Sequence, residues 1–168
     1  GRERILSALS LEIPDRVPLY IHGINEAPIV GIGRRIGADV PDTIEFHAMD
    51  DLDKMRLVEA LFLLHDVFGI DGFTSFEIGH ESEIDSKHVR DDWGIVYTRS
   101  PHGIPVASGH PITDARALST YRPPVPERGH LLLLDLARDR FGDRKALFWL
   151  MRGTFVRSWR LIGMENYM

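Results

Sequence analysis

Five polar residues near the ends of predicted strands have side chains that could carry out chemistry together: His22, Glu77, His80, Glu81 and Arg152. An imidazole, a carboxylate and a guanidinium at one place would supply a base, an acid and a clamp for an anion. We therefore predict that Glu77 and His22 act in catalysis, with Glu81 close enough to join them. Arg152 and His80 are predicted to bind substrate. The alternative is that each side chain caps a strand end and hydrogen-bonds to loop backbone.

Parallel strands would bring these polar residues to one mouth. Three short apolar segments, each followed by a polar residue of this group, are predicted strands: residues 17–21, 70–76 and 146–151. The spacing of apolar residues predicts helices at 2–11, 51–68, 129–140 and from about Thr154. Such alternation of strands and helices is typical of parallel strands with helical crossovers, whose carboxyl ends face the same side. Residues 25–43, with scattered Gly and Pro, are predicted to be a loop.

The helix predicted at residues 51–68 has clear signals at both ends. Asp50 and the aspartates that follow it favour a helix N-terminus, and Gly69 suits a C-terminal stop. His65 lies on the apolar face of this helix. We predict that it is a packing residue whose hydrogen bonds are satisfied.

Composition excludes several classes of partner. The chain has 168 residues, 43% of them hydrophobic, and a net charge of -5, which suits one globular domain or part of a larger one. Nucleic acid is not expected as a partner, because the longest basic run is Arg34-Arg35. No apolar run approaches the roughly 18 residues of a membrane span, and no signal peptide is visible, so we expect a cytoplasmic protein without a membrane partner. The absence of cysteine excludes disulfides and thiolate chemistry within these residues.

One segment interrupts the alternation of strands and helices. Asp91 to Ile112, DDWGIVYTRSPHGIPVASGHPI, predicts two short strands joined by a turn at residues 100–103. Trp93 and Tyr97 are expected to pack this hairpin down. The sequence leaves open whether the hairpin contacts substrate or is purely structural.

Three segments, in the same order, resemble the uroporphyrinogen decarboxylase superfamily, which includes cobamide-dependent methyltransferases. They are RERILSALSLEIPDRVPLY, the hairpin with its continuation LSTYRPPVPE, and RGTFVRSWRLIGMENYM. The resemblance implies the N-terminal part of a (β/α)₈ TIM barrel, with the β-hairpin inserted after the second strand as a rim or lid. A complete barrel usually needs about 250 residues, so residues 1–168 would be a partial domain of about half a barrel, inactive by itself.

Within this superfamily, the resemblance favours methyl transfer. In the decarboxylases, an arginine motif after the first strand binds the acidic groups of the tetrapyrrole; here Gly23 and Ala27 stand at those arginine positions. Arg34 and Arg35 lie too far along the chain to replace them on the same loop path. The methyltransferases lack the arginine motif and bind zinc through His and Cys residues in the other half of the barrel, so no metal ligand is expected in this half.

The resemblance therefore implies a methyltransferase that acts on a small-molecule substrate, with zinc, a corrinoid cofactor and a corrinoid protein docked over the barrel mouth. A homodimer is one alternative for its assembly. The alternative activity is uroporphyrinogen III decarboxylase in porphyrin and heme biosynthesis, which needs no cofactor. A second alternative is a small α/β module that binds a small molecule or a corrinoid protein without catalysis.

Overall fold

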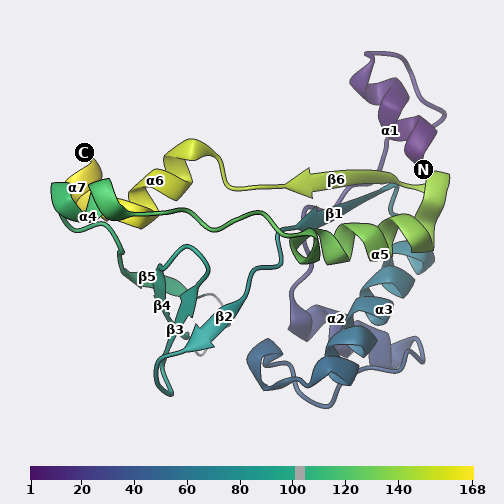
Figure 1. Ribbon diagram of the computed structural model, residues 1–168. Coiled ribbons are helices and arrows are strands. Elements are labelled where there is room, and N and C mark those ends of the chain that lie inside the picture. The colour runs from purple at the N-terminus through teal and green to yellow at the C-terminus, as the bar shows by residue number, and fades with distance from the viewer. Residues whose placement is uncertain (101–104) are drawn as a thin grey trace. The chain divides into compact units, whose positions relative to one another are not determined.

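The computed structural model describes residues 1–100 and 105–168, which form two compact units. Unit 1 comprises Gly1–Phe76 and Leu133–Leu150, and unit 2 comprises Glu77–Leu132 and Met151–Met168. The described residues have a mixed α/β structure, with one parallel and one antiparallel sheet and no closed barrel (Figure 1). Within the same residues, no helix has both the length and the apolar character that crossing a membrane requires.

The sheet of unit 1 is parallel, as the strand and helix alternation predicted. The elements of this unit are α1 (Arg2–Leu9), α2 (Glu26–Arg35), α3 (Asp51–Val67), β1 (Gly72–Phe76), α5 (Leu132–Phe141) and β6 (Ala146–Leu150). β1 and β6 lie side by side in Figure 1, and Gly72 pairs with Ala146 and Phe76 with Leu150. Both strands therefore end at the same edge, and the chain continues from those ends into Glu77 and toward Arg152.

The prediction of a strand at residues 17–21 is wrong except at one residue. Only Tyr20 forms a bridge, parallel to Gly72 of β1. Pro18 stands in the middle of this segment, and proline has no N–H to donate to a strand ladder. Val17 is 86% exposed, whereas a strand covered on both faces would bury it.

The prediction of a loop at residues 25–43 is also wrong, because α2 occupies ten of these residues. Pro28 lies in the first turn of α2, where backbone N–H groups have no partner within the helix, so it does not break the helix. Ile29 and Val30 are buried against α3 in a shared apolar cluster. Packing against α3 therefore outweighs the low helix propensity of the glycines.

α3 has the ends that the sequence predicts. The side chain of Asp50 accepts a hydrogen bond of 2.8 Å from the backbone N–H of Asp53 and so caps the helix N-terminus. Gly69 has a φ of 61°, a left-handed conformation that favours glycine after a helix. His65 is 3% exposed, and its Nδ1 lies 2.8 Å from the carbonyl oxygen of Leu61, which confirms its packing role.

Aromatic rings fill the core of unit 1 between α3, β1 and α5. Phe62, Phe73 and Phe141 are each 1% exposed, with ring centroids 5.1 to 5.5 Å apart. Tilted and edge-on aromatic pairs at such distances stabilise a core beyond the area they bury. This core fixes α3 and α5 against β1.

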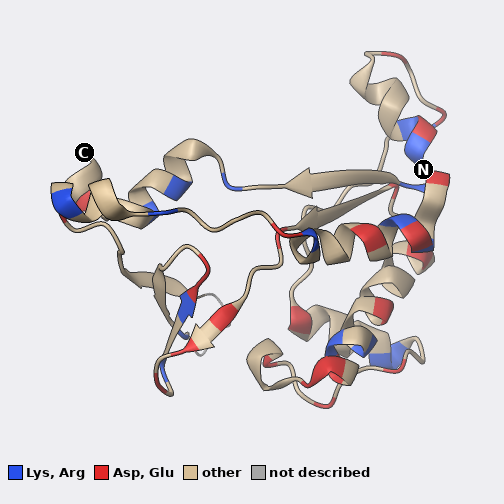
Figure 2. Cartoon of the chain, viewed as in Figure 1, with Lys and Arg blue, Asp and Glu red and all other residues tan. Residues whose placement is uncertain are grey.

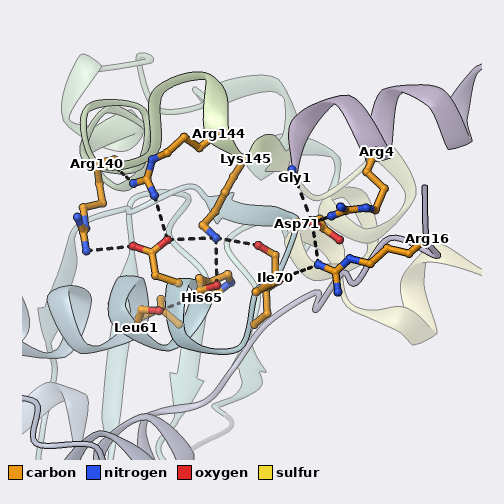
Figure 3. Close-up of polar contacts among 12 residues, drawn as sticks. Gly1, Arg4, Arg16, Leu61, His65, Ile70, Asp71, Arg140, Arg144 and Lys145 are labelled. Atoms are coloured by element: carbon orange, nitrogen blue, oxygen red, sulfur yellow. Dashed lines mark hydrogen bonds and ion pairs between the residues drawn. The ribbon is translucent and has the colours of Figure 1, made fainter. Parts of the chain in front are cut away.

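A buried carboxylate ties the N-terminal segment to the start of β1 (Figure 3). Asp71 is 2% exposed, accepts a 2.8 Å hydrogen bond from the backbone N–H of Leu19, and forms ion pairs with Arg4 and Arg16. Arg4 also donates two hydrogen bonds, of 2.6 and 2.7 Å, to Asp15. The charged residues of the opening segment RERILSALSLEIPDRVPLY therefore have a structural role here.

A buried lysine closes the C-terminus of α3, as Figure 3 also shows. The Nζ of Lys145 donates to the carbonyl oxygens of His65, at 3.0 Å, and Ile70, at 2.8 Å. It also lies 3.2 Å from Asp66. His65 lies in the last turn of α3 and Ile70 lies just beyond the helix, so this lysine links the end of α3 to the start of β6.

Unit 2 is built on an antiparallel sheet with the strand order β2-β3-β4-β5. Its elements are β2 (Glu81–Glu83), β3 (His88–Asp91), β4 (Val96–Thr98), β5 (Val106–Gly109), α4 (Ala115–Thr120), α6 (Thr154–Ile162) and α7 (Met164–Tyr167). β4 and β5 are the two strands of the predicted hairpin, and they pair from Val96 to Thr98. The predicted turn at residues 100–103 lies outside the described residues except for Ser100. β2 and β3 were not predicted.

A small apolar core holds this sheet together. Val89, Ile95 and Tyr97 are buried, and Trp93 packs against them, as expected for the hairpin. Leu161 of α6 joins the same cluster. The sheet and α6 are therefore one packed body, although residues 110–153 separate them in sequence.

Candidate active site

Unit 2 contains a cavity of about 280 Å³, just below the usual range for small-molecule pockets, which begins at about 300 Å³. Four of the five residues singled out in the sequence line it: Glu77, His80, Glu81 and Arg152. Its walls come from the segment after β1, from the sheet and from α6 with the residues before it. The cavity is therefore polar, and it belongs to unit 2 alone.

His22 belongs to unit 1. It is exposed, in a bend two residues after the Tyr20 bridge, and it is not among the residues that line the cavity. Its predicted part in catalysis stays a prediction.

Glu77 is held in place by an arginine of α6. The Nη2 of Arg157 donates a 3.1 Å hydrogen bond to Oε2 of Glu77. The guanidinium of Arg157 also stacks on Trp93, with its central carbon 4.0 Å from the ring centroid. The side chain of Arg157 is only 12% exposed, and the Trp93 ring and the Glu77 carboxylate together hold its guanidinium in place. Glu77 remains half-buried and reaches the cavity as an oriented carboxylate.

A second carboxylate in the cavity wall, that of Asp91, has a raised pKa. Burial raises the pKa of Asp91, although hydrogen bonds from the backbone N–H of Ile95, at 2.9 Å, and the Tyr97 hydroxyl, at 3.3 Å, oppose this. Arg160 donates a 3.2 Å hydrogen bond to the same hydroxyl. The result is a chain of hydrogen bonds from the Arg160 guanidinium through Tyr97 to Asp91.

Two histidines flank a third carboxylate, Asp92. The backbone N–H of His80 donates to Oδ2 of Asp92 at 2.7 Å, and Nε2 of His130 lies 3.6 Å from the same oxygen. The two imidazole ring centroids are 6.3 Å apart. The side chain of His80 is 78% exposed, whereas the side chain of His130 is largely buried. The backbone hydrogen bond from Ile78 to the carbonyl of His130, at 3.1 Å, brings His130 here.

Arg152 differs from the other two arginines of the cavity. It makes no hydrogen bond or ion pair with any residue of the described ranges. Partial burial of its guanidinium and the nearby charge of Arg160 lower the pKa of Arg152, although the residue as a whole remains exposed. Figure 2 shows basic residues, in blue, on α6 and on the segment before it. Arg152 is therefore a cation available to a ligand.

Sequence reasoning missed Asp91, Asp92, Arg157 and Arg160 as residues of this cavity. One signal could have indicated the arginines: Arg157 and Arg160 are three residues apart and so share one face of the predicted last helix. Nothing in the sequence says that this face packs against the hairpin. The two aspartates therefore became site residues only with the tertiary structure.

The arrangement can perform acid and base chemistry and bind anions. It combines an oriented carboxylate, an exposed imidazole and a guanidinium that has no hydrogen bond or ion pair within residues 1–100 and 105–168. No three His, Cys, Asp or Glu residues gather closely enough to hold a metal ion in the part of the chain that the structure describes. The superfamily resemblance predicts zinc ligands outside these residues, and zinc binding stays a prediction.

A comparison of the chain with family models, curated proteins and solved structures found no match. The superfamily resemblance therefore rests on the three sequence segments quoted above.

Proposed function

We propose that the complete protein is an enzyme of the uroporphyrinogen decarboxylase superfamily that transfers a methyl group to or from a corrinoid, with its active site at the unit 2 cavity. The observation that carries this proposal is that Glu77, His80 and Arg152, singled out from the sequence alone, line one cavity. Aromatic residues of the predicted hairpin, Trp93 and Tyr97, line the same cavity. This supports a role of the hairpin as a wall of the site.

The proposal extends to the fold. We propose that residues 1–168 are the N-terminal part of a (β/α)₈ barrel, with the sheet β2-β3-β4-β5 inserted after the second barrel strand. The parallel pairing of β1 with β6 and the position of the antiparallel sheet directly after β1 support this. Sequencing the gene beyond Met168 tests it: strands and helices of a further half barrel are expected. A stop codon there would favour the small binding module instead.

Within the superfamily, the proposal of methyl transfer rests on Gly23 and Ala27, which stand where the decarboxylases have arginines. The residues of this chain would hold and orient the methyl acceptor or donor. When a thiol acceptor forms its bond to the methyl group, Glu77, fixed by Arg157, would accept the proton that the thiol loses, and the exposed His80 would lead that proton to solvent. Zinc, held outside these residues, would supply Lewis-acid activation when bound. A cytoplasmic location, a corrinoid-protein partner and a homodimer remain part of the proposal.

Methyl transfer predicts a metal-dependent activity of the complete protein. Zinc should co-purify with it, and the protein should consume a methylated corrinoid, which can be followed by the change in corrinoid absorbance. Chelation of zinc should abolish turnover, and added zinc should restore it. Release of carbon dioxide from uroporphyrinogen by metal-free protein would contradict methyl transfer and establish the decarboxylase. Absence of both activities, with a corrinoid protein bound, would favour a non-catalytic module.

A further inference from the structure

We propose that the unit 2 cavity takes a ligand that carries an organic oxyanion, a carboxylate or a phosphate, and that the guanidinium of Arg152 binds this group. The inference rests on the proposed function in one respect, since it takes this cavity as the ligand site. It adds the chemical class of the group that Arg152, predicted from the sequence to bind substrate, would recognise.

The first argument is that two of the three arginines in the cavity already have partners. Arg157 pairs with Glu77 at 3.1 Å and stacks on Trp93. Arg160 donates to the Tyr97 hydroxyl at 3.2 Å, with its central carbon 5.7 Å from the same ring. Both guanidiniums therefore line the cavity and are held in fixed positions by these partners.

The second argument is that the neighbouring carboxylates do not neutralise Arg152. Glu77 is bound by Arg157, Asp91 by Ile95 and Tyr97, and Asp92 by the backbone of His80. The charge of Asp91 acts to raise the pKa of Arg152, but burial and the charge of Arg160 outweigh it. The fourth carboxylate, Glu81, is exposed at the first residue of β2 and forms no ion pair with Arg152 among the described residues.

The third argument is electrostatic. Three guanidiniums face one small cavity, and the charges of Arg160 and Arg157 act on Arg152, whose pKa is lowered by burial and by these neighbours. An anion beside Arg152 would offset the repulsion from Arg157 and Arg160. It would also replace the hydration that the Arg152 guanidinium loses on burial. The planar fork of a guanidinium donates two parallel hydrogen bonds to a carboxylate or a phosphate, which adds geometric specificity to the attraction.

The proposal can be tested by direct binding measurements on the full chain, without a catalytic assay. The probes are acetate and inorganic phosphate, each titrated at constant ionic strength with chloride as the competing salt, and tetramethylammonium as a cationic control. Isothermal calorimetry or NMR shifts of the arginine side chains report binding. We expect dissociation constants on the order of millimolar for at least one anion, since a small ion makes few contacts, and no binding of the cation.

Replacing Arg152 with Gln should weaken binding of that anion at least about tenfold, because it removes a charge-assisted hydrogen-bond pair. Arg152→Lys keeps the charge without the fork and should lie between Arg152→Gln and wild type. Arg116→Gln, an equal change of charge at an exposed position of α4 outside the cavity, should leave binding unchanged. Melting temperatures of all variants control for folding, and the lysine variant keeps the test valid if the glutamine variant unfolds.

Each outcome decides the proposal. Tighter binding of acetate than of phosphate assigns a carboxylate ligand, and the reverse order assigns a phosphate. Equal binding by wild type and the folded Arg152→Gln variant, or no binding of either anion by wild type, would overturn the inference. If the anion binds through Arg152 but the complete protein transfers no methyl group, the proposed function fails while this inference stands.

Discussion

Replacing Asp71 with Asn is expected to lower the free energy of unfolding by about 2 kcal/mol, because the buried side chain loses its charge-assisted hydrogen bonds to Arg4 and to the backbone of Leu19. Asp71 is 2% exposed, and it binds the backbone of Leu19 as well as Arg4 and Arg16. The amide keeps the shape of the side chain but removes its charge. Urea unfolding of the full chain, followed by circular dichroism, measures the loss.

Asp15→Asn is the matched control, because Asp15 also pairs with Arg4 but its side chain is 69% exposed. Exposed ion pairs contribute less than about 1 kcal/mol, so this variant should be nearly as stable as wild type. Equal and small effects of both substitutions would show that the buried pair does not hold the N-terminal segment.

The buried ion pairs of Asp71 also predict how the stability of the fold depends on pH. Burial by itself would raise the pKa of Asp71, but the hydrogen bond from Leu19 and the charges of Arg4 and Arg16 outweigh it and hold the pKa below its ordinary value. A carboxyl group with a lowered folded-state pKa stabilises the fold above its unfolded pKa, about 3.9, and loses this contribution as the pH falls through the folded value. Wild type should therefore lose stability more steeply than Asp71→Asn below about pH 4. Parallel curves would contradict the assignment.

Replacing Glu77 with Gln is expected to lower kcat/KM of the complete protein about 100-fold or more, the usual size of a lost general acid or base. Glutamine has the same length, and its carbonyl oxygen can still accept the hydrogen bond from Arg157. Glu77 is also only half-buried, so the melting temperature should change little.

Glu165→Gln removes a carboxylate from α7, outside the cavity, and serves as the control for that assay. It should leave kcat/KM and the melting temperature unchanged. If Glu77→Gln lowers the melting temperature but keeps wild-type kcat/KM, Glu77 has a structural role as the partner of Arg157.

Elements with strong local signals could be predicted from the sequence. α3 has a capping aspartate, a long apolar face and a terminal glycine. β6 is a short apolar run, and β1, with the sequence Gly-Phe-Thr-Ser-Phe, follows directly after that helix. The elements that were missed depend on contacts distant in sequence. α2 is a helix because Ile29 and Val30 pack on α3, and β2, with the sequence Glu-Ser-Glu, has no apolar residue to mark it as a strand.

The candidate site shows the same division. Glu77 and Arg152 could be predicted because each follows a strand that ends at a shared edge of the parallel sheet. Arg157 on α6 orients Glu77, and Asp91 at the end of β3 lies in the wall of the same cavity. Their positions in the cavity depend on how α6 packs on the antiparallel sheet. No local pattern specifies that contact. The opening segment that carries part of the superfamily resemblance proved to hold structural ion pairs, which composition alone could not reveal.

The most direct test of the central claim is a crystal structure of the complete protein with its methylated corrinoid donor and methyl acceptor bound. The account predicts that a reacting ligand lies in the unit 2 cavity, within hydrogen-bonding distance of the Glu77 carboxylate and the Arg152 guanidinium. A ligand bound elsewhere, with contact to neither residue, would contradict the assignment of this cavity as the active site.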